Sequence, residues 1–296
     1  MRASRLFGRP VRFVSAIASV GLVAVTLTAC QQLPHAALVV GDGIRVAISQ
    51  STIQAGKDSF VVESNNPTRS AGSHIVLFRL KAGATLTRVA TDWHNEYSLT
   101  PAVAAAGSRA VVRDMDTIGL ADVSGGASAT VTVNLSAGSY FLTDLGDLPS
   151  IGELPTFTPL RVTAGAAASP LHGQFSVRAT SADRFAAPST WPHTGTLLFT
   201  NADTDSMHFM DLQRVTPGTT DAQIQAYFDS KGAGHAPALF LPGYPSAGNS
   251  DVTPGNSTLL TYNLPAGSYV LFCFASDPVS GMEHALMGMH KVITLS

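Results

Sequence analysis

The last third of the chain holds the side chains best suited to chemistry. Cys273 ends an apolar run, His284 follows after a loop, and Met289 directly precedes the last apolar run. His208 lies upstream, shortly after an apolar segment that ends at Asn201. Thiolate, imidazole and thioether groups are ligands that soft and borderline transition metals prefer. These residue types therefore predict a metal-binding site.

The order of these residues resembles that of the cupredoxins, the blue-copper family of plastocyanin and its relatives. In that family a Gly-x-Tyr-x-x-x-Cys strand leads to a loop carrying His and Met, and the last strand follows the Met. The run Gly267-Ser268-Tyr269-Val270-Leu271-Phe272-Cys273 fits this strand, and His284 precedes Met289 at the plastocyanin spacing. The family's upstream histidine follows a Phe-x-Asn strand, as His208 follows Phe199-Thr200-Asn201.

The resemblance implies a mononuclear type 1-like copper site in the second half of the chain. Its equatorial ligands are expected to be His208, Cys273 and His284, with Met289 as the axial ligand. A thiolate with two imidazoles forms a trigonal copper site, and a thioether adds a weak axial contact. The function that this implies is one-electron transfer.

The ligand loop departs from the family pattern. Ten residues separate Cys273 from His284, many more than in the small single-domain cupredoxins, although the type 1 domain of copper nitrite reductases has loops nearly as long. Met287 is a second candidate for the axial ligand. His290 is expected to face away from the site, because adjacent residues of an extended strand point to opposite sides.

Short alternating apolar runs bounded by Gly, Pro and Asn predict an all-β fold. We expect two tandem cupredoxin-like Greek-key β-sandwich domains, each with a short helix after the strand of its first histidine. The repeat of Asn134-Leu135-Ser136-Ala137-Gly138-Ser139-Tyr140 as Asn263-Leu264-Pro265-Ala266-Gly267-Ser268-Tyr269 indicates a domain duplication. The predicted domains are residues 36–164 and 171–296, joined by a linker at 165–170. The predicted helices begin near Leu86 and Asp221, each after a threonine N-cap.

The first copy of the repeat has the same predicted strands as the second but lacks the metal-ligating residues. His74 takes the place of His208, and Asp144 stands where Cys273 stands in the second copy. The loop after Asp144 has neither His nor Met. His74 and Asp144 alone are too few for a metal site, so this domain is expected to be structural, or to dock against the second domain.

The N-terminal segment predicts export and a lipid anchor. Four arginines among the first twelve residues precede an apolar run from Phe13 to Leu27. This order is typical of a secretory signal, and the run is shorter than the ~20 residues that span a bilayer. Leu27-Thr28-Ala29-Cys30 resembles the lipobox of bacterial lipoproteins, which implies cleavage after residue 29 and lipidation of Cys30. Residues 1–29 are then the signal peptide. We expect the protein at the extracytoplasmic face of the cell membrane.

Cysteine usage and charge narrow the function further. With Cys30 lipidated, Cys273 has no disulfide partner in the chain, which favours a buried or metal-bound thiol. A net charge of −2 and 13% charged residues argue against nucleic acid as a partner. A redox partner protein in the cell envelope is expected instead. Copper storage or delivery, and a metal-free envelope scaffold, are the alternative functions. No enzyme motif was found, so the chain is predicted not to be an enzyme.

Overall fold

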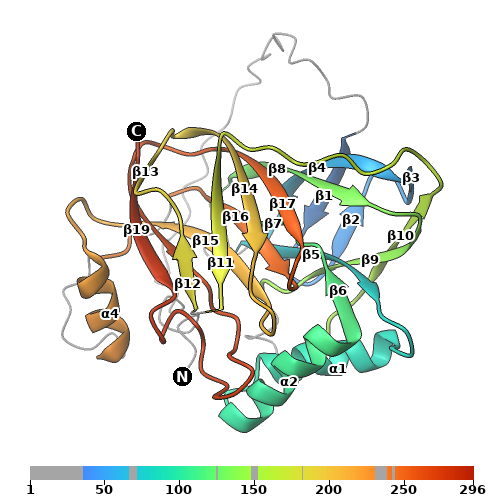
Figure 1. Ribbon diagram of the computed structural model, residues 1–296, viewed down its shortest axis with the longest axis horizontal. Helices are drawn as coiled ribbons and strands as arrows, with labels where there is room; N and C mark the ends of the chain where they lie inside the picture. The colour runs from blue at the N-terminus through green and yellow to red at the C-terminus, as the bar shows by residue number, and fades with distance from the viewer. Residues whose placement is uncertain are drawn as a thin grey trace, which may run out of the picture.

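The computed structural model describes residues 36–66, 72–124, 126–147, 153–181, 183–230, 239–241 and 244–296. Within these residues the chain is mostly β, with two sheets and three helices (Figure 1). The predicted all-β fold class and its β-sandwich sheets are confirmed. Cys30 and the predicted signal peptide lie outside the described residues. No helix in the described part of the chain is long and apolar enough to cross a membrane.

One sheet has eight strands, in the spatial order β12-β11-β14-β17-β8-β4-β1-β2. In that order the strands are Arg184–Ala186, Phe175–Thr180, Thr194–Asn201, Ser257–Asn263, Ser128–Leu135, Gly56–Ser64, Ala37–Gly41 and Val46–Ile48. Along β4 alternate residues are buried, including Phe60 and Val62, because successive side chains of a strand point to opposite faces. These side chains form part of the core between the sheets.

The second sheet runs in the order β13-β19-β18-β15-β16-β7-β5-β9-β10-β3, with β6 paired to β5. In that order the strands are Thr190–Trp191, His290–Leu295, Gly267–Phe272, His208–Arg214, Ser246–Val252, Ala121–Ser124, Ser73–Leu80, Gly138–Asp144, Thr158–Thr163 and Thr52–Gln54, and β6 is Met115–Thr117. This sheet carries β5 and β15, the strands that hold His74 and His208 near or at their first residue.

Both sheets pass without a break from one half of the chain to the other. In the first sheet β17 pairs with β8, which opposes Leu260 to Val131, and in the second sheet β16 pairs with β7. The strand order on one side of each junction mirrors the order on the other side. The junctions cover strand edges that an isolated half would expose. The predicted domain boundaries at 36–164 and 171–296 stay a prediction.

The repeated sequence motif has the same local structure in both halves. The hydroxyl of Tyr140 donates a hydrogen bond to the carbonyl of Ser136 at 3.1 Å, and that of Tyr269 donates to the carbonyl of Pro265 at 2.8 Å. Both tyrosines are buried. Each therefore fixes the tight turn that leads into β9, which ends at Asp144, or into β18, which ends next to Cys273.

The helices follow the histidine strands, with one addition that the sequence analysis missed. Helix α1 (Leu86–Glu96) follows β5, and α4 (Asp221–Asp229) follows β15. Thr85 and Thr220 are their N-caps, as predicted. Helix α2 (Pro101–Asp114) was not predicted. It packs against α1 at one end of the sandwich (Figure 1).

Candidate metal centre

Cys273 directly follows β18 and is fully buried in the main core. Strand β18 lies between β15 and β19, so the cysteine is adjacent to the strand that His208 begins and to the strand that follows Met289. Burial raises the pKa of the Cys273 thiol, whereas the backbone N–H groups of Phe209 and Ala275 lower it. These two N–H groups would stabilise the thiolate once a cation replaces the proton.

His208 is the first residue of β15 and is also fully buried. Its Nδ1 lies 3.7 Å from the Cys273 sulfur, and its Nε2 lies 3.1 Å from Oδ2 of Asp203. An ionised carboxylate can only accept a hydrogen bond, so the Nε2–H of His208 donates to Asp203. The Nδ1 nitrogen then carries the lone pair, which points at the sulfur. Burial raises the pKa of Asp203, but hydrogen bonds from His208 and from backbone N–H groups hold it well below the ordinary value. Asp203 therefore holds His208 in a ligand tautomer.

The long loop between Cys273 and His284 folds as a small hairpin. This hairpin explains how a loop longer than the family pattern can still bring His284 close to Cys273. Ser276 and Glu283 form an antiparallel bridge. The N–H of His284 donates to the carbonyl of Ala275 at 3.0 Å, and that of Ala285 donates to the carbonyl of Cys273 at 2.7 Å. The extra residues thus form an excursion whose two ends meet. His284 returns to the cysteine despite the ten residues between them.

The Nδ1 of His284 lies 3.7 Å from the Cys273 sulfur, the same distance as for His208. The two imidazole centroids are 4.6 Å apart. Metal–nitrogen and metal–sulfur bonds of about 2.0 and 2.3 Å place such atoms roughly 3.5–3.7 Å apart at tetrahedral to trigonal angles. The three side chains therefore fit a single ion, and His208, Cys273 and His284 form a group that could hold a metal.

The protonation state of His284 suits ligation. Burial and the charge of His208 lower its pKa to about 3, against an opposite effect of Asp277 and Asp203. The imidazole is therefore neutral at physiological pH. A neutral ring can offer a nitrogen lone pair to a cation without first losing a proton.

Among the axial candidates, the structure favours Met289 over Met287. Phe272 and His290 are the last residues paired between β18 and β19, so Met289 lies one register step further, across from Cys273. Met289 is fully buried in the same core. The sulfur of Met287 instead accepts a hydrogen bond from Ser280 at 3.7 Å in an exposed setting.

His290 faces away from the site, as predicted. Its Nε2 lies 3.0 Å from Oε1 of Gln225, and its Nδ1 lies 3.4 Å from Oδ1 of Asp221, both on α4. His290 thus connects β19 to α4, and it is not a metal ligand in this arrangement.

The first half forms no equivalent centre. Asp144 accepts hydrogen bonds from the backbone N–H groups of Gly43, His74 and Gly146. The His74 imidazole instead lies between Asp122 at 2.8 Å and Asp251 at 3.2 Å. Among the described residues, each group of three potential metal ligands lies in the second half.

The helical pair of the first half holds the ligand hairpin of the second, a contact that the sequence analysis missed. Buried Glu96, at the end of α1, accepts the N–H of Ser276 at 2.8 Å, and its carbonyl accepts the Ser276 hydroxyl at 2.9 Å. Arg109 on α2 donates to the carbonyl of Pro278. Figure 1 shows the red loop of the second half reaching α2. Pro101 at the first turn could have predicted the start of α2. No local sequence pattern predicts the contact between Glu96 and Ser276, which lie far apart in the chain.

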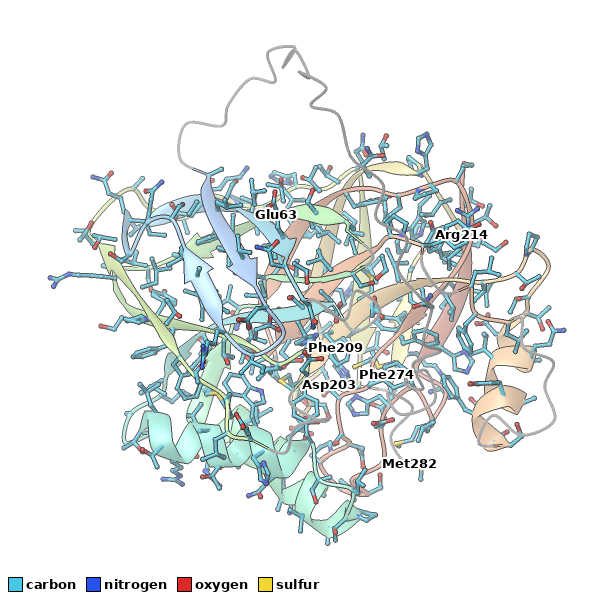
Figure 2. The ribbon with its side chains drawn as sticks, turned by 180° about the vertical axis from the view of Figure 1, so that it is seen from behind. Glu63, Asp203, Phe209, Arg214, Phe274 and Met282 are labelled. Carbon is cyan, nitrogen blue, oxygen red and sulfur yellow. The ribbon has the colours of Figure 1, made fainter. Side chains whose placement is uncertain are left out.

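Asp203 is a second residue that the sequence analysis missed. Figure 2 shows Asp203, Phe209 and Phe274 near the middle of the molecule, and Met282 further toward the helices. Asp203 lies five residues before His208 and has no motif of its own. A carboxylate that orients a histidine can come from any neighbouring segment, so only the fold identifies it.

Neither a protein-family model nor a curated protein matches this chain. Solved structures with similarity include a reduced auracyanin from Roseiflexus castenholzii, at 16% identity and a TM-score of 0.26, over 41% of this chain and 95% of that one. A copper nitrite reductase from Nitrosomonas europaea matches at 11% identity and a TM-score of 0.22, over 88% and 82%. A laccase from Pediococcus acidilactici matches at 10% identity and a TM-score of 0.24, over 88% and 59%.

These similarities correct one prediction. The sequence analysis excluded an enzyme, but the nitrite reductase and the laccase are enzymes by their names. The prediction that the chain is not an enzyme is therefore wrong as a general exclusion. Identities and TM-scores this low assign no activity to this chain.

Proposed function

We propose that this chain is a copper protein that transfers single electrons through one type 1-like site in its second half. The ligands are His208, Cys273 and His284, with Met289 as the axial ligand. The observation that carries the proposal is the placement of one buried sulfur 3.7 Å from the Nδ1 of each of two buried histidines.

A copper ion at these ligands supplies one-electron redox chemistry. The chain itself supplies a rigid, buried frame. Strands β15 and β18 fix His208 and Cys273, the hairpin returns His284, and Asp203 sets the His208 tautomer. Donors that are already in place need little rearrangement when the charge of the site changes.

Burial of the site favours electron transfer over copper delivery. Cys273, His208 and His284 have no exposed surface. An ion that must be handed to a partner needs an accessible ligand, whereas an electron can cross a covering layer. Met282, 47% exposed, and Val279, 87% exposed, lie on the ligand hairpin and offer an apolar contact for a redox partner.

We also propose that the protein acts at the outer face of the cell membrane, anchored by a lipid on Cys30. The apolar run before Leu27-Thr28-Ala29-Cys30 supports this part of the proposal. Metabolic labelling with a fatty-acid analogue tests it. Label that disappears in Cys30→Ala supports the anchor, and label that remains contradicts it.

Visible and electron-spin spectra of the copper-loaded full chain test the copper site. We expect one thiolate-bound copper per chain, seen as an intense thiolate-to-copper band that Cys273→Ser removes. Tight Cu(I) binding without that band would favour copper storage or delivery. A chain that binds no stoichiometric copper would contradict both functions.

A further inference from the structure

The outer edges of the two ligand histidines face a group of three carboxylates. His284 Nε2 lies 3.7 Å from Oδ1 of Asp183. Asp183, Asp277 and His284 Nε2 form one group whose potential ligand atoms lie within 4.8 Å of one another, and Asp183, Asp203 and His208 form another. Asp203 already accepts a hydrogen bond from His208. Oδ1 of Asp277 already accepts hydrogen bonds from the N–H groups of Val279 and Ser280. The part of the group without an assigned role is therefore Asp183 and the outer nitrogen of His284.

The outer nitrogen of His284 is an independent sign that a ligand belongs there. His284 has no exposed surface, and its Nε2 has no hydrogen-bond partner. A buried polar atom without a partner destabilises the folded chain, and a bound cation would remove that cost. At 3.7 Å, Asp183 is too distant for an ordinary N–H···O hydrogen bond but close enough to share a cation with the ring.

We propose that the carboxylates of Asp183 and Asp277 and the Nε2 of His284 form a second cation site, back to back with the thiolate site across the His284 ring. The donor set identifies the class of ion. One imidazole and two carboxylates suit zinc and similar divalent ions. Calcium and magnesium favour oxygen ligands alone, and Cu(I) favours sulfur.

Access and proton balance are compatible with this site. The Asp183 side chain is 20% exposed, which leaves a path for the ion and room for water as a further ligand. When only the second site is filled, His284 keeps its single proton on Nδ1. When both sites are filled, that ring must lose its last N–H proton to solvent and bridge the two ions as an imidazolate. No electron moves in this step.

Cobalt binding by the full chain separates the two sites, because only a thiolate ligand gives Co²⁺ an intense near-ultraviolet charge-transfer band. We expect wild type to bind two Co²⁺ ions by equilibrium dialysis, with the band produced by one of them. Cys273→Ser should lose the band and retain one ion. Asp183→Asn combined with Asp277→Asn should keep the band and bind the second ion at least about 100-fold more weakly, since even outer-shell partners change metal affinity roughly 10- to 100-fold.

Asp205→Asn is the matched control, because Asp205 is an exposed carboxylate in the loop before His208. It should bind both ions like wild type, and circular dichroism should show that all variants are folded. A wild type that binds only one Co²⁺, with the thiolate band, overturns the second site and leaves the proposed function intact. A single ion without the band, lost in the double Asn variant, supports the second site and contradicts the thiolate site. Unchanged binding of two ions by the double Asn variant overturns this inference.

Discussion

His74 and His208 lie at the start of equivalent strands, β5 and β15, but their rings have different surroundings. His74 lies between Asp122 and Asp251, and Asp144 beyond it accepts backbone N–H groups. His208 donates to Asp203 with one nitrogen and directs the other at the Cys273 sulfur. The same frame therefore either neutralises a buried histidine with carboxylates or brings soft donors together. In the first arrangement carboxylates balance the charge of the histidine, and in the second the donor atoms fit a cation.

Replacing the thiol with the first half's residue should have the largest effect. In Cys273→Asp we expect complete loss of the thiolate-to-copper band, because a carboxylate cannot supply a sulfur donor. Visible absorption during a copper titration measures this loss. His172→Gln, at an exposed position, is the control and should keep the band. A band that survives in Cys273→Asp would disprove the assigned thiolate.

The reverse exchange should fail to create a site in the first half. Asp144→Cys removes the acceptor of the Gly43, His74 and Gly146 N–H groups. Unsatisfied buried groups cost about 1–3 kcal/mol each, so we expect a loss of about 2–4 kcal/mol in the free energy of unfolding. Urea unfolding measures it, with exposed Glu63→Gln as the control. A second copper band in Asp144→Cys would show that the frame alone suffices.

The partner of His208 should matter less than the ligands themselves. Asp203→Asn keeps the side-chain shape but removes the charge that holds the His208 proton on Nε2. We expect the copper affinity to fall roughly 10- to 100-fold, as for other residues that orient a metal ligand. Competition with a chelator measures the affinity, and Asp205→Asn should be unchanged. An unaltered affinity in Asp203→Asn would mean that the strand alone orients the ring.

The first half should also affect the site through its helices. Glu96→Ala removes the acceptor of the Ser276 N–H in the ligand hairpin. We expect a loss of about 1–3 kcal/mol in unfolding free energy and a shifted copper band, because the hairpin positions His284. Glu96→Gln keeps an acceptor and should retain most of both properties. A loss of stability with an unmoved band would show that the helices stabilise the fold without positioning the ligand.

The His74 position predicts a pH dependence of smaller size. Burial lowers the pKa of His74, but Asp251 and Asp122 together raise it well above its ordinary value. The folded chain therefore holds this proton more tightly than the unfolded chain. The resulting stability is complete below about pH 6.5 and is lost as pH rises through the folded pKa, by about 1.4 kcal/mol for each unit between the two values.

Burial and the charge of Asp122 raise the pKa of Asp211 to about 8, against an opposite effect of His74. Asp211 therefore changes stability in the same sense as His74. The free energy of unfolding, measured with denaturant at pH values above about 6.5, should fall less steeply with rising pH in His74→Gln than in wild type. His172→Gln should keep the wild-type slope. Equal slopes in His74→Gln and wild type would contradict a charged His74.

The local patterns predicted the all-β fold class, the Thr85 and Thr220 caps, and His208, Cys273 and His284 as candidate ligands. Cys273, His284 and His208 were identifiable because the motif keeps them at fixed places on strands. The hairpin between Cys273 and His284 could not be predicted, because it packs against α1 from the other half of the chain. The Glu96–Ser276 contact joins segments from opposite halves of the chain. Asp183 and Asp203 likewise reach the site only through the fold.

X-ray absorption at the copper edge of the loaded full chain tests the central claim most directly. The account predicts one copper ion with one sulfur from Cys273 and two imidazole nitrogens, from His208 and His284, in its inner shell. The sulfur contribution should vanish in Cys273→Ser. A wild-type spectrum with nitrogen and oxygen neighbours alone, or one that Cys273→Ser leaves unchanged, would contradict the account.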